Sequence, residues 1–355
     1  MRIRIIAFTE TGCRLAGALV GALRASGDEV VACGPARFVG GSELTAYENL
    51  SSWTETAFSQ ADALVFVSAC GIAVRAIAPH VRDKYCDPAV VCVDDTGRFV
   101  VPLLSGHVGG ANALARRVAR ACEGTPVIST ATDVHGIFAV DEWAAHHGLA
   151  MLDREVAKRV SAVLLAGETV GLVSDYPISG RIPAGLVEGV ADRETGICIS
   201  LDERKKPFAC TLRLVPRILT VGVGCKRGTT SEQLEELVDH CLDEAHVDVH
   251  AVVTLASIDV KADEGGLLAL AHERGWNLRL HSADELAAVP GSFSSSEFVR
   301  QVVGVDNVCE RAACACGETL LLPRRSGSGV TVALGAGDPR LSFERLGERE
   351  EMPWC

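Results

Sequence analysis

The stretch VVPLLSGHVGGANALARRVA (residues 100–119) is the part of the sequence that most clearly indicates the fold. A continuous apolar run ends at Leu104, a glycine-rich turn follows, and a helical pattern begins near Ala111 with arginines opposite its apolar face. A strand that is apolar throughout is covered on both faces, and a helix directly after it provides such cover. The stretch therefore predicts an α/β fold.

The same alternation of strand and helix extends over residues 1–145. Several of the apolar runs are continuous, and between them lie segments whose apolar residues recur at helical spacing. We therefore expect an N-terminal α/β domain with a doubly wound sheet, whose strand order the pattern does not specify. The predicted strands are Arg2–Phe8, Val30–Gly34, Ala63–Ala69, Ala89–Asp94, Phe99–Leu104 and Pro126–Thr130, and the predicted helices are Thr11–Ser26, Ala73–Val81 and Gly110–Cys122.

Two further regions follow the first domain. Residues 146–217 predict a small middle module with a helix at 153–166, a strand at 169–174 and turns rich in glycine and proline. Residues 218–340 return to the α/β rhythm and predict a C-terminal domain of ordinary size. We expect residues 341–355 to be a tail, and the arginine- and glutamate-rich end after Gly335 to be loosely held. The predicted helices of the C-terminal domain are 231–245, 265–275, 283–288 and 295–303, and its strands begin at 218, 251, 277 and 330.

Composition and charge exclude several classes of protein. Hydrophobic residues make up 48% and charged residues 23%, which is typical of a globular chain with a sizeable core. The net charge of -12 repels a phosphate backbone, and no Lys/Arg-rich run offsets it, so we expect no nucleic acid partner. The first apolar run is broken by Thr9 and Glu10 and is too short for a signal peptide or a membrane span. We therefore expect a cytoplasmic protein without a membrane contact.

The 14 cysteines are scattered through apolar stretches, which favours buried free thiols in a reducing compartment over disulfides. Cys309, Cys314 and Cys316 form the tightest cluster. This cluster lacks the paired Cys-x-x-Cys arms of a structural zinc site, so we interpret it as a cysteine-rich helix face, with metal ligation as the alternative.

The turn of residues 105–110 is the first candidate site. Glycines let backbone N–H groups approach an anion at a helix N-terminus, so the turn could hold a carboxylate. We expect the turn to lie at the carboxyl edge of the sheet, where ligands bind in open α/β folds. His107 could move a proton near neutral pH, or it could simply hydrogen-bond the backbone of the turn. The substrate-binding candidates here are Ser105, Gly106, Gly109, Gly110 and Asn112.

Two neighbouring segments carry polar residues for the same site. STATDVHG (residues 129–136) adds Thr130, Thr132 and Asp133 at a strand end, where Asp133 could orient a histidine or merely cap a helix. GIAVRAIAPHVRDKYCDP (residues 71–88) adds candidates that could bind carboxylates by charge-assisted bonds, whereas Arg82 is equally well explained as a surface charge. These candidates are Gly71, Arg75 and Lys84.

The C-terminal domain repeats the strand, glycine turn and helix in VGVGCKRGTTSEQLEEL (residues 221–237), which predicts a second anion-binding turn with Gly224, Lys226 and Arg227. Cys225 could be a nucleophile activated by the cations, although no histidine partner is identifiable nearby. Lys261 and Glu310 are further candidates to face the site. Glu310 has a second explanation, because an acid is favoured in the first turn of a helix.

Six motifs in a fixed order resemble the CbiG family of cobalt-precorrin-5A hydrolases. They are CGIAVRAIAPHVRDKYCDPAV (70–90), LLSGHVGGAN (103–112), TATDVHG (130–136), GVGCKRGTT (222–230), SIDVKADEGGL (257–267) and FVRQVVGVDNVCERAA (298–313). The resemblance implies three parts, the last similar to the separate protein CobE. It also implies a hydrolase of the anaerobic cobalamin pathway that opens the δ-lactone of cobalt-precorrin-5A and releases acetaldehyde. Cobalt arrives inside the substrate, so the resemblance implies no protein-bound metal or cofactor, and transient contact with the pathway's methyltransferases is a further expectation.

This chemistry assigns hypothetical roles to the candidates. Opening a lactone needs an activated water and donors for the oxyanion that forms. We expect His107 to be the general base, Asp133 to orient it or act as an alternate base, and the Gly109 and Gly110 N–H groups to bind the oxyanion. Arg75, Lys84, Lys226 and Arg227 would bind substrate carboxylates.

Two other interpretations stay open at this stage. The chain could carry a corrinoid intermediate to other enzymes of the pathway without catalysing a reaction. It could also be an acyl hydrolase or nucleotide-dependent enzyme of another pathway, although it has neither a G-x-S-x-G elbow nor a Walker sequence.

Overall fold

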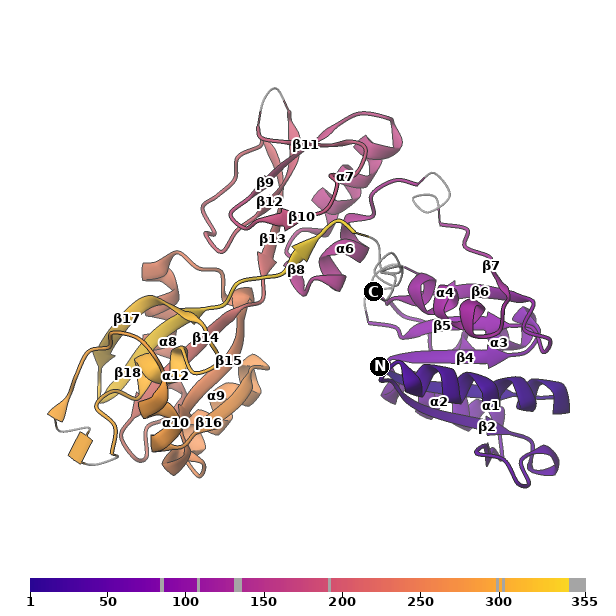
Figure 1. The fold of residues 1–355 in the computed structure, drawn as a ribbon, viewed down its shortest axis with the longest axis horizontal. Helices are drawn as coiled ribbons and strands as arrows, with labels where there is room; N and C mark the ends of the chain where they lie inside the picture. The colour runs from indigo at the N-terminus through magenta and orange to yellow at the C-terminus, as the bar shows by residue number, and fades with distance from the viewer. Residues whose placement is uncertain are drawn as a thin grey trace, which may run out of the picture. The chain divides into compact units, whose positions relative to one another are not determined.

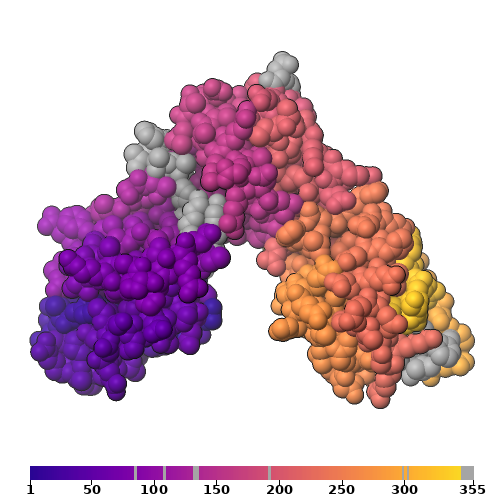
Figure 2. All heavy atoms as spheres, turned by 180° about the vertical axis from the view of Figure 1, so that it is seen from behind, coloured from indigo at the N-terminus to yellow at the C-terminus, as the bar shows by residue number. Residues whose placement is uncertain are grey.

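The structure is a computed structural model that describes residues 1–83, 86–106, 109–130, 136–190, 193–297, 300–301 and 304–344. The chain divides after Glu142 into two units, coloured indigo to purple and magenta to yellow in Figure 1. Each unit is a closely packed body (Figure 2). In the described residues, no helix is long and apolar enough to cross a membrane, and no group of three His, Cys, Asp or Glu residues could hold a metal ion.

The N-terminal unit is a doubly wound α/β sheet, as predicted. Its strand order is β3-β2-β1-β4-β5-β6-β7, and β1 pairs in parallel with both β2 and β4. Helices α1 and α4 share a core on one face, and α2 and α3 share a core on the other. The strands are β1 (Arg2–Ala7), β2 (Glu29–Gly34), β3 (Thr45–Ala46), β4 (Ala63–Val67), β5 (Ala89–Val93), β6 (Phe99–Leu104) and β7 (Thr125–Pro126), and the helices are α1 (Glu10–Ala25), α2 (Leu50–Gln60), α3 (Cys70–Ile77) and α4 (Ala111–Ala121).

The direction of β6 decides where its glycine turn lies. Strand β6 runs antiparallel to β5, with Leu104 opposite Val90 and Val100 opposite Val93. The turn that follows β6 therefore lies where β5 begins, at the amino-terminal edge of β1, β4 and β5. Our expectation that this turn occupies the carboxyl edge of those strands is wrong, because an apolar run does not encode strand direction.

The second unit contains two five-stranded sheets. The first has the order β11-β9-β12-β13-β8 and includes β9 (Val170–Ser174), which agrees with the predicted strand. Helix α7 (Arg154–Leu165), also as predicted, contacts three of its strands. The remaining elements are α6 (Val140–His146), which contains the boundary between the units, and β8 (Leu149–Met151), β10 (Ile178–Ser179), β11 (Leu186–Glu188), β12 (Thr195–Ile199) and β13 (Cys210–Pro216).

The second sheet of this unit has the order β16-β15-β14-β18-β17, with β14, β15 and β16 parallel. Helices α8 and α9 cover one face, and α10 and α12 cover the other. Val215 of β13 belongs to the core under α8, so the two sheets share a core. The elements are β14 (Leu219–Cys225), α8 (Ser231–Ala245), β15 (Val252–Ile258), α9 (Gly265–Arg274), β16 (Asn277–His281), α10 (Ala283–Ala288), α12 (Cys309–Ala313), β17 (Thr319–Gly327) and β18 (Val330–Ala336). The predicted helix at 295–303 lies partly outside the described residues.

The end of the described chain is docked rather than loosely held. Strand β19 (Leu341–Ser342) pairs in parallel with β10, and both of its residues are buried. The Trp143 indole N–H donates to the Ser342 carbonyl at 2.8 Å, and the rings of Trp143 and Phe343 stack at 5.2 Å. The expectation of a loosely held end is therefore wrong for residues 341–343, which strand pairing, a hydrogen bond and a ring contact hold in place, and residues 345–355 lie outside the described residues.

Candidate functional site

The turn after β6 has a backbone that few sequences could adopt. Ser105 has a φ of 56°, unusual for a residue other than glycine, and its buried hydroxyl donates to the Asp87 carbonyl at 3.0 Å. A side chain at Gly109 would place its Cβ 2.3 Å from the Cβ of Ser105, so this position requires glycine. Gly110, with a φ of 83°, is the N-cap of α4. The turn is thus a tightly constrained entry to a helix N-terminus.

The turn is joined to the loop after β7. Asn112, in the first turn of α4 and almost fully buried, donates from its side-chain amide to the Thr130 hydroxyl at 3.0 Å. Its backbone N–H donates to the Gly106 carbonyl at 2.9 Å. The structure therefore brings together the described candidates Ser105, Gly106, Gly109, Gly110, Asn112 and Thr130. Four other predicted residues, His107, Asp133, Lys84 and Thr132, lie outside the described residues.

Gly71 and Arg75 do not join this group. Both lie in α3, which begins at the carboxyl end of β4, and the Arg75 guanidinium donates to the Gly71 carbonyl at 3.3 Å. The five residues of β5 separate the two edges of the sheet by about 16 Å. Arg82 is placed differently, because its N–H donates to the carboxylate of Asp87, whose carbonyl binds Ser105. The segment after α3, and not its first turn, therefore adjoins the glycine turn.

The second turn lies at the carboxyl ends of β14 and β15. The Lys226 N–H donates to the Gly329 carbonyl at 3.1 Å, and the Thr229 hydroxyl donates to the Lys226 carbonyl at 2.8 Å. Arg227 lies 4.0 Å from Asp263, and both side chains are largely exposed. Gly224 is half-buried and packs against Thr331. The turn thus presents two cationic side chains to solvent.

Glu264 is a residue of this region that the sequence patterns did not identify as a candidate. It is buried, and its carboxylate accepts from the Gly228 N–H at 2.6 Å and from the Lys261 ammonium at 3.2 Å. Burial raises the pKa of this carboxyl, but these two donors lower it by more, so the pKa lies below the usual value. Lys261 therefore lies beside the turn and is paired with a carboxylate of the protein.

The hypothesis of a nucleophilic Cys225 is not supported. Burial raises the pKa of the Cys225 thiol, and the neighbouring Lys261 ammonium lowers it by less. A thiol that stays protonated at neutral pH is a poor nucleophile.

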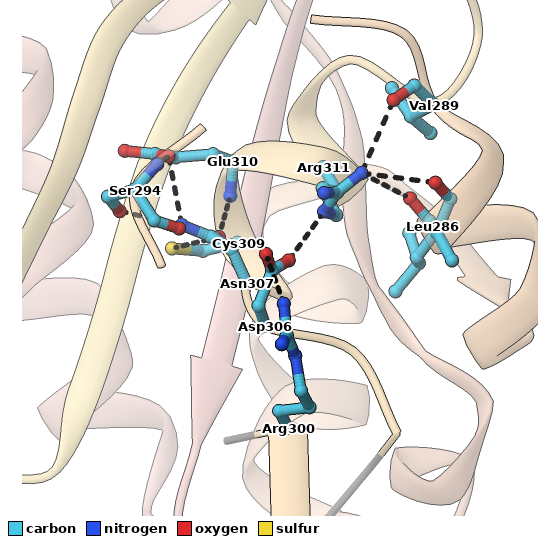
Figure 3. A network of polar contacts seen from close by, with 10 residues as sticks. Leu286, Val289, Ser294, Arg300, Asp306, Asn307, Cys309, Glu310 and Arg311 are labelled. Atoms are coloured by element: carbon cyan, nitrogen blue, oxygen red, sulfur yellow. Dashed lines mark hydrogen bonds and ion pairs between the residues drawn. The ribbon is translucent and has the colours of Figure 1, made fainter. Parts of the chain in front are cut away.

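Glu310 belongs to an internal network rather than to the second turn (Figure 3). One carboxylate oxygen accepts from the Ser294 N–H at 2.7 Å and the Asn307 side-chain amide at 2.9 Å, and the other accepts from the Arg324 N–H at 2.8 Å. The register between β17 and β18 shifts between Leu322 and Arg325. The Arg324 N–H is therefore free to donate to Glu310 instead of to a residue of β18. Glu310 is only 1% exposed, which favours a structural role for this candidate over contact with a substrate.

Three family models match successive parts of the chain. They are Cobalamin synthesis G N-terminal over residues 52–133, Cobalamin biosynthesis central region over residues 138–216, and Cobalamin synthesis G C-terminus over residues 219–335. A cobalt-precorrin-5A hydrolase from Salmonella typhimurium is 36% identical over 311 residues, which cover 84% of this chain and 86% of that protein. The chain belongs to the CbiG family. The family resemblance of the six motifs is confirmed.

Two more relatives bear on the parts of this CbiG protein. A cobalt-precorrin-5A hydrolase from Priestia megaterium is 31% identical over 78% of this chain and 79% of its own length. Protein CobE from Sinorhizobium sp. is 30% identical over 130 residues, which are 36% of this chain and 84% of CobE. The C-terminal region of the CbiG protein resembles CobE, as predicted.

Proposed function

We propose that this CbiG protein is a cobalt-precorrin-5A hydrolase of the anaerobic cobalamin pathway. It opens the δ-lactone of its substrate, which gives cobalt-precorrin-5B and acetaldehyde. The observation that carries the proposal is the 36% identity to the Salmonella typhimurium hydrolase over 84% of the chain. The motifs 103–112 and 222–230 form the two constrained turns described above, so the residues that indicated the family also form the candidate sites.

The cations of the second turn suit such a substrate. A cobalt-corrinoid precursor carries several acetate and propionate carboxylates around an apolar macrocycle. Lys226 and Arg227 are exposed at one edge of the C-terminal sheet, and charge-assisted bonds to carboxylates are stronger than neutral hydrogen bonds. These two residues therefore bind substrate carboxylates in our proposal.

The first turn supplies the reacting groups in the same proposal. His107 takes a proton from the attacking water, Asp133 orients His107, and the Gly109 and Gly110 N–H groups bind the oxyanion of the tetrahedral intermediate. The hydrogen bond from Asn112 to Thr130 supports this pairing, because it joins the loop that contains His107 to the loop that leads to Asp133. Cobalt belongs to the substrate, and the protein contributes no metal or cofactor of its own. We also place the reaction in the cytoplasm.

The test is an anaerobic incubation of the full chain with cobalt-precorrin-5A. Acetaldehyde is followed by coupled NADH oxidation, and the tetrapyrrole is followed by mass. One acetaldehyde per substrate, together with loss of the two-carbon unit, is the expected result. Tight binding without acetaldehyde would instead indicate a carrier of the intermediate and would overturn the hydrolase.

A further inference from the structure

Glu264 occupies a helix N-cap position without capping its helix. It precedes α9, yet its side chain accepts no hydrogen bond from that helix. Instead its two oxygens accept from Gly228, in the turn after β14, and from Lys261, in the segment after β15. One buried carboxylate therefore ties together two loops that follow neighbouring parallel strands.

Backbone packing brings the same two loops into close contact. A Cβ at Gly266 would lie 2.2 Å from the Thr229 carbonyl oxygen, so α9 approaches the turn as closely as a glycine permits. Thr229 itself is buried. The position of the turn thus depends on the loop that carries Glu264.

The opposite side of the turn rests on the hairpin between β17 and β18. Gly329 has a φ of 82°, and a Cβ there would lie 2.8 Å from the Cδ atom of Lys226. The aliphatic part of Lys226 therefore lies over the Gly329 backbone while the side chain remains exposed. Lys226 makes no ion pair with any residue that the structure describes, so its ammonium group has no competing carboxylate there.

We propose that Glu264 is a positioning residue that fixes Lys226 and Lys261 for a carboxylate of the substrate. This inference rests on the proposed function, because it assumes a polycarboxylate tetrapyrrole as ligand. Glu264 fixes the turn through Gly228 and holds the Lys261 ammonium beside it, while the hairpin directs Lys226 outward. A substrate carboxylate that docks at either ammonium group meets a cation whose position is already set, so less entropy is lost on binding.

The test compares full-length variants in steady-state kinetics with cobalt-precorrin-5A. We expect Lys226→Met and Glu264→Ala each to raise KM about tenfold. Glu264→Gln should raise KM less, since its amide oxygen can still accept from the Gly228 N–H, and kcat should stay within about twofold in all three variants. Glu244→Gln is the matched control, because Glu244 pairs with Arg325 at 2.5 Å elsewhere in the same unit. A purely structural role would lower thermal stability and the active fraction at unchanged KM, and that result would overturn the inference.

A binding experiment separates this inference from the proposed function. Uroporphyrin III, a tetrapyrrole with eight carboxylates, is titrated while its fluorescence is followed. Weaker binding by Lys226→Met and Glu264→Ala than by the wild type and Glu244→Gln supports the inference even if no variant releases acetaldehyde. Equal affinities in all variants, with acetaldehyde released by the wild type, would overturn the inference and leave the hydrolase intact.

Discussion

The role proposed for His107, which lies outside the described residues, can be tested by one substitution. Glutamine at this position keeps a polar side chain but cannot act as a general base. We expect His107→Gln to lower kcat by roughly 10²- to 10⁴-fold, the usual contribution of such a group. Substrate affinity, measured by titration, should change little. Equal turnover by the variant would remove His107 from catalysis.

The ion pairs of Asp28 should make the free energy of unfolding of the N-terminal unit depend on pH. Its nearly buried carboxylate accepts from the Met1 ammonium at 2.9 Å and pairs with Arg117 of α4. Burial raises the pKa of Asp28, but these two cations lower it by more, so the pKa lies below its usual value. The stabilisation is therefore fully present above about pH 4 and is lost as the pH falls through the lowered pKa.

We expect Asp28→Asn to reduce the free energy of unfolding by about 1.5–3 kcal/mol at pH 7, the range for hydrogen bonds to charged groups. The difference from the wild type should shrink below pH 4. Urea unfolding at pH 7, 5 and 3 measures it. Glu43→Gln is the control, since its exposed pair with Arg24 should contribute less than about 1 kcal/mol. A difference that does not vary with pH would contradict the ion pairs as its cause.

Single residues also show which parts of the candidate sites could be predicted from the sequence and which could not. Lys226 and Arg227 were found because cations beside glycines in a strand-end turn form a local pattern. Glu264 was missed because an acid before a helix is normally explained by its own helix, and its bond to Gly228 spans 36 residues. Gly71 and Arg75 lie at the carboxyl end of β4, as a strand-end position implies, but the glycine turn with which they were grouped lies at the other edge, since its position depends on the direction of β6.

Helix α12 is the element whose role changed most between sequence and structure. Glu310 of α12 and Asn307, which precedes the helix, both hydrogen-bond to Ser294, while Arg311 donates to the Leu286 and Val289 carbonyls (Figure 3). We interpret the polar residues at the end of the motif 298–313 as contacts that stabilise the segment between α10 and α12. In this interpretation they stabilise the fold and do not bind the substrate.

Glu310→Ala tests this interpretation. The substitution leaves the Ser294 and Arg324 N–H groups without their acceptor and removes one of the acceptors of the Asn307 amide, which should cost about 3 kcal/mol of unfolding free energy. Chemical denaturation measures the loss, and Glu236→Ala, at an exposed position of α8, is the control. Variant protein that remains folded should keep the KM of the wild type. A raised KM at unchanged stability would return Glu310 to the substrate site.

Helices and strands could be predicted where their hydrophobic pattern extends over many residues. The amphipathic repeat of α4 and the continuous apolar runs of β4 and β5 gave these elements within one or two residues. The two-residue strands β3 and β19 were missed, because two residues cannot show the alternation of apolar and polar side chains that identifies a strand. The direction of β6 could not be predicted from the sequence either, since parallel and antiparallel strands can have the same composition.

At the scale of the whole chain, the two α/β rhythms predicted the N-terminal and C-terminal sheets. The order of the elements along the sequence did not predict that the segment after β18 packs against the middle region of the chain. Trp143 and Ser342 are 199 residues apart, yet they share a hydrogen bond. Contacts over such separations depend on the shape of the folded sheets, which no local pattern contains.

Two truncations test this return of the chain. A variant that ends at Gly337 lacks β19 and Phe343, whereas a variant that ends at Glu344 keeps both, and each lacks Trp354. We expect the shorter variant to lose about 2–4 kcal/mol of unfolding free energy relative to the longer one, mainly because Leu341 is no longer buried. Its tryptophan emission should shift to the red, since Trp143 loses the Phe343 ring and the Ser342 carbonyl. Identical emission and stability in the two variants would mean that β19 does not hold this part of the second unit together.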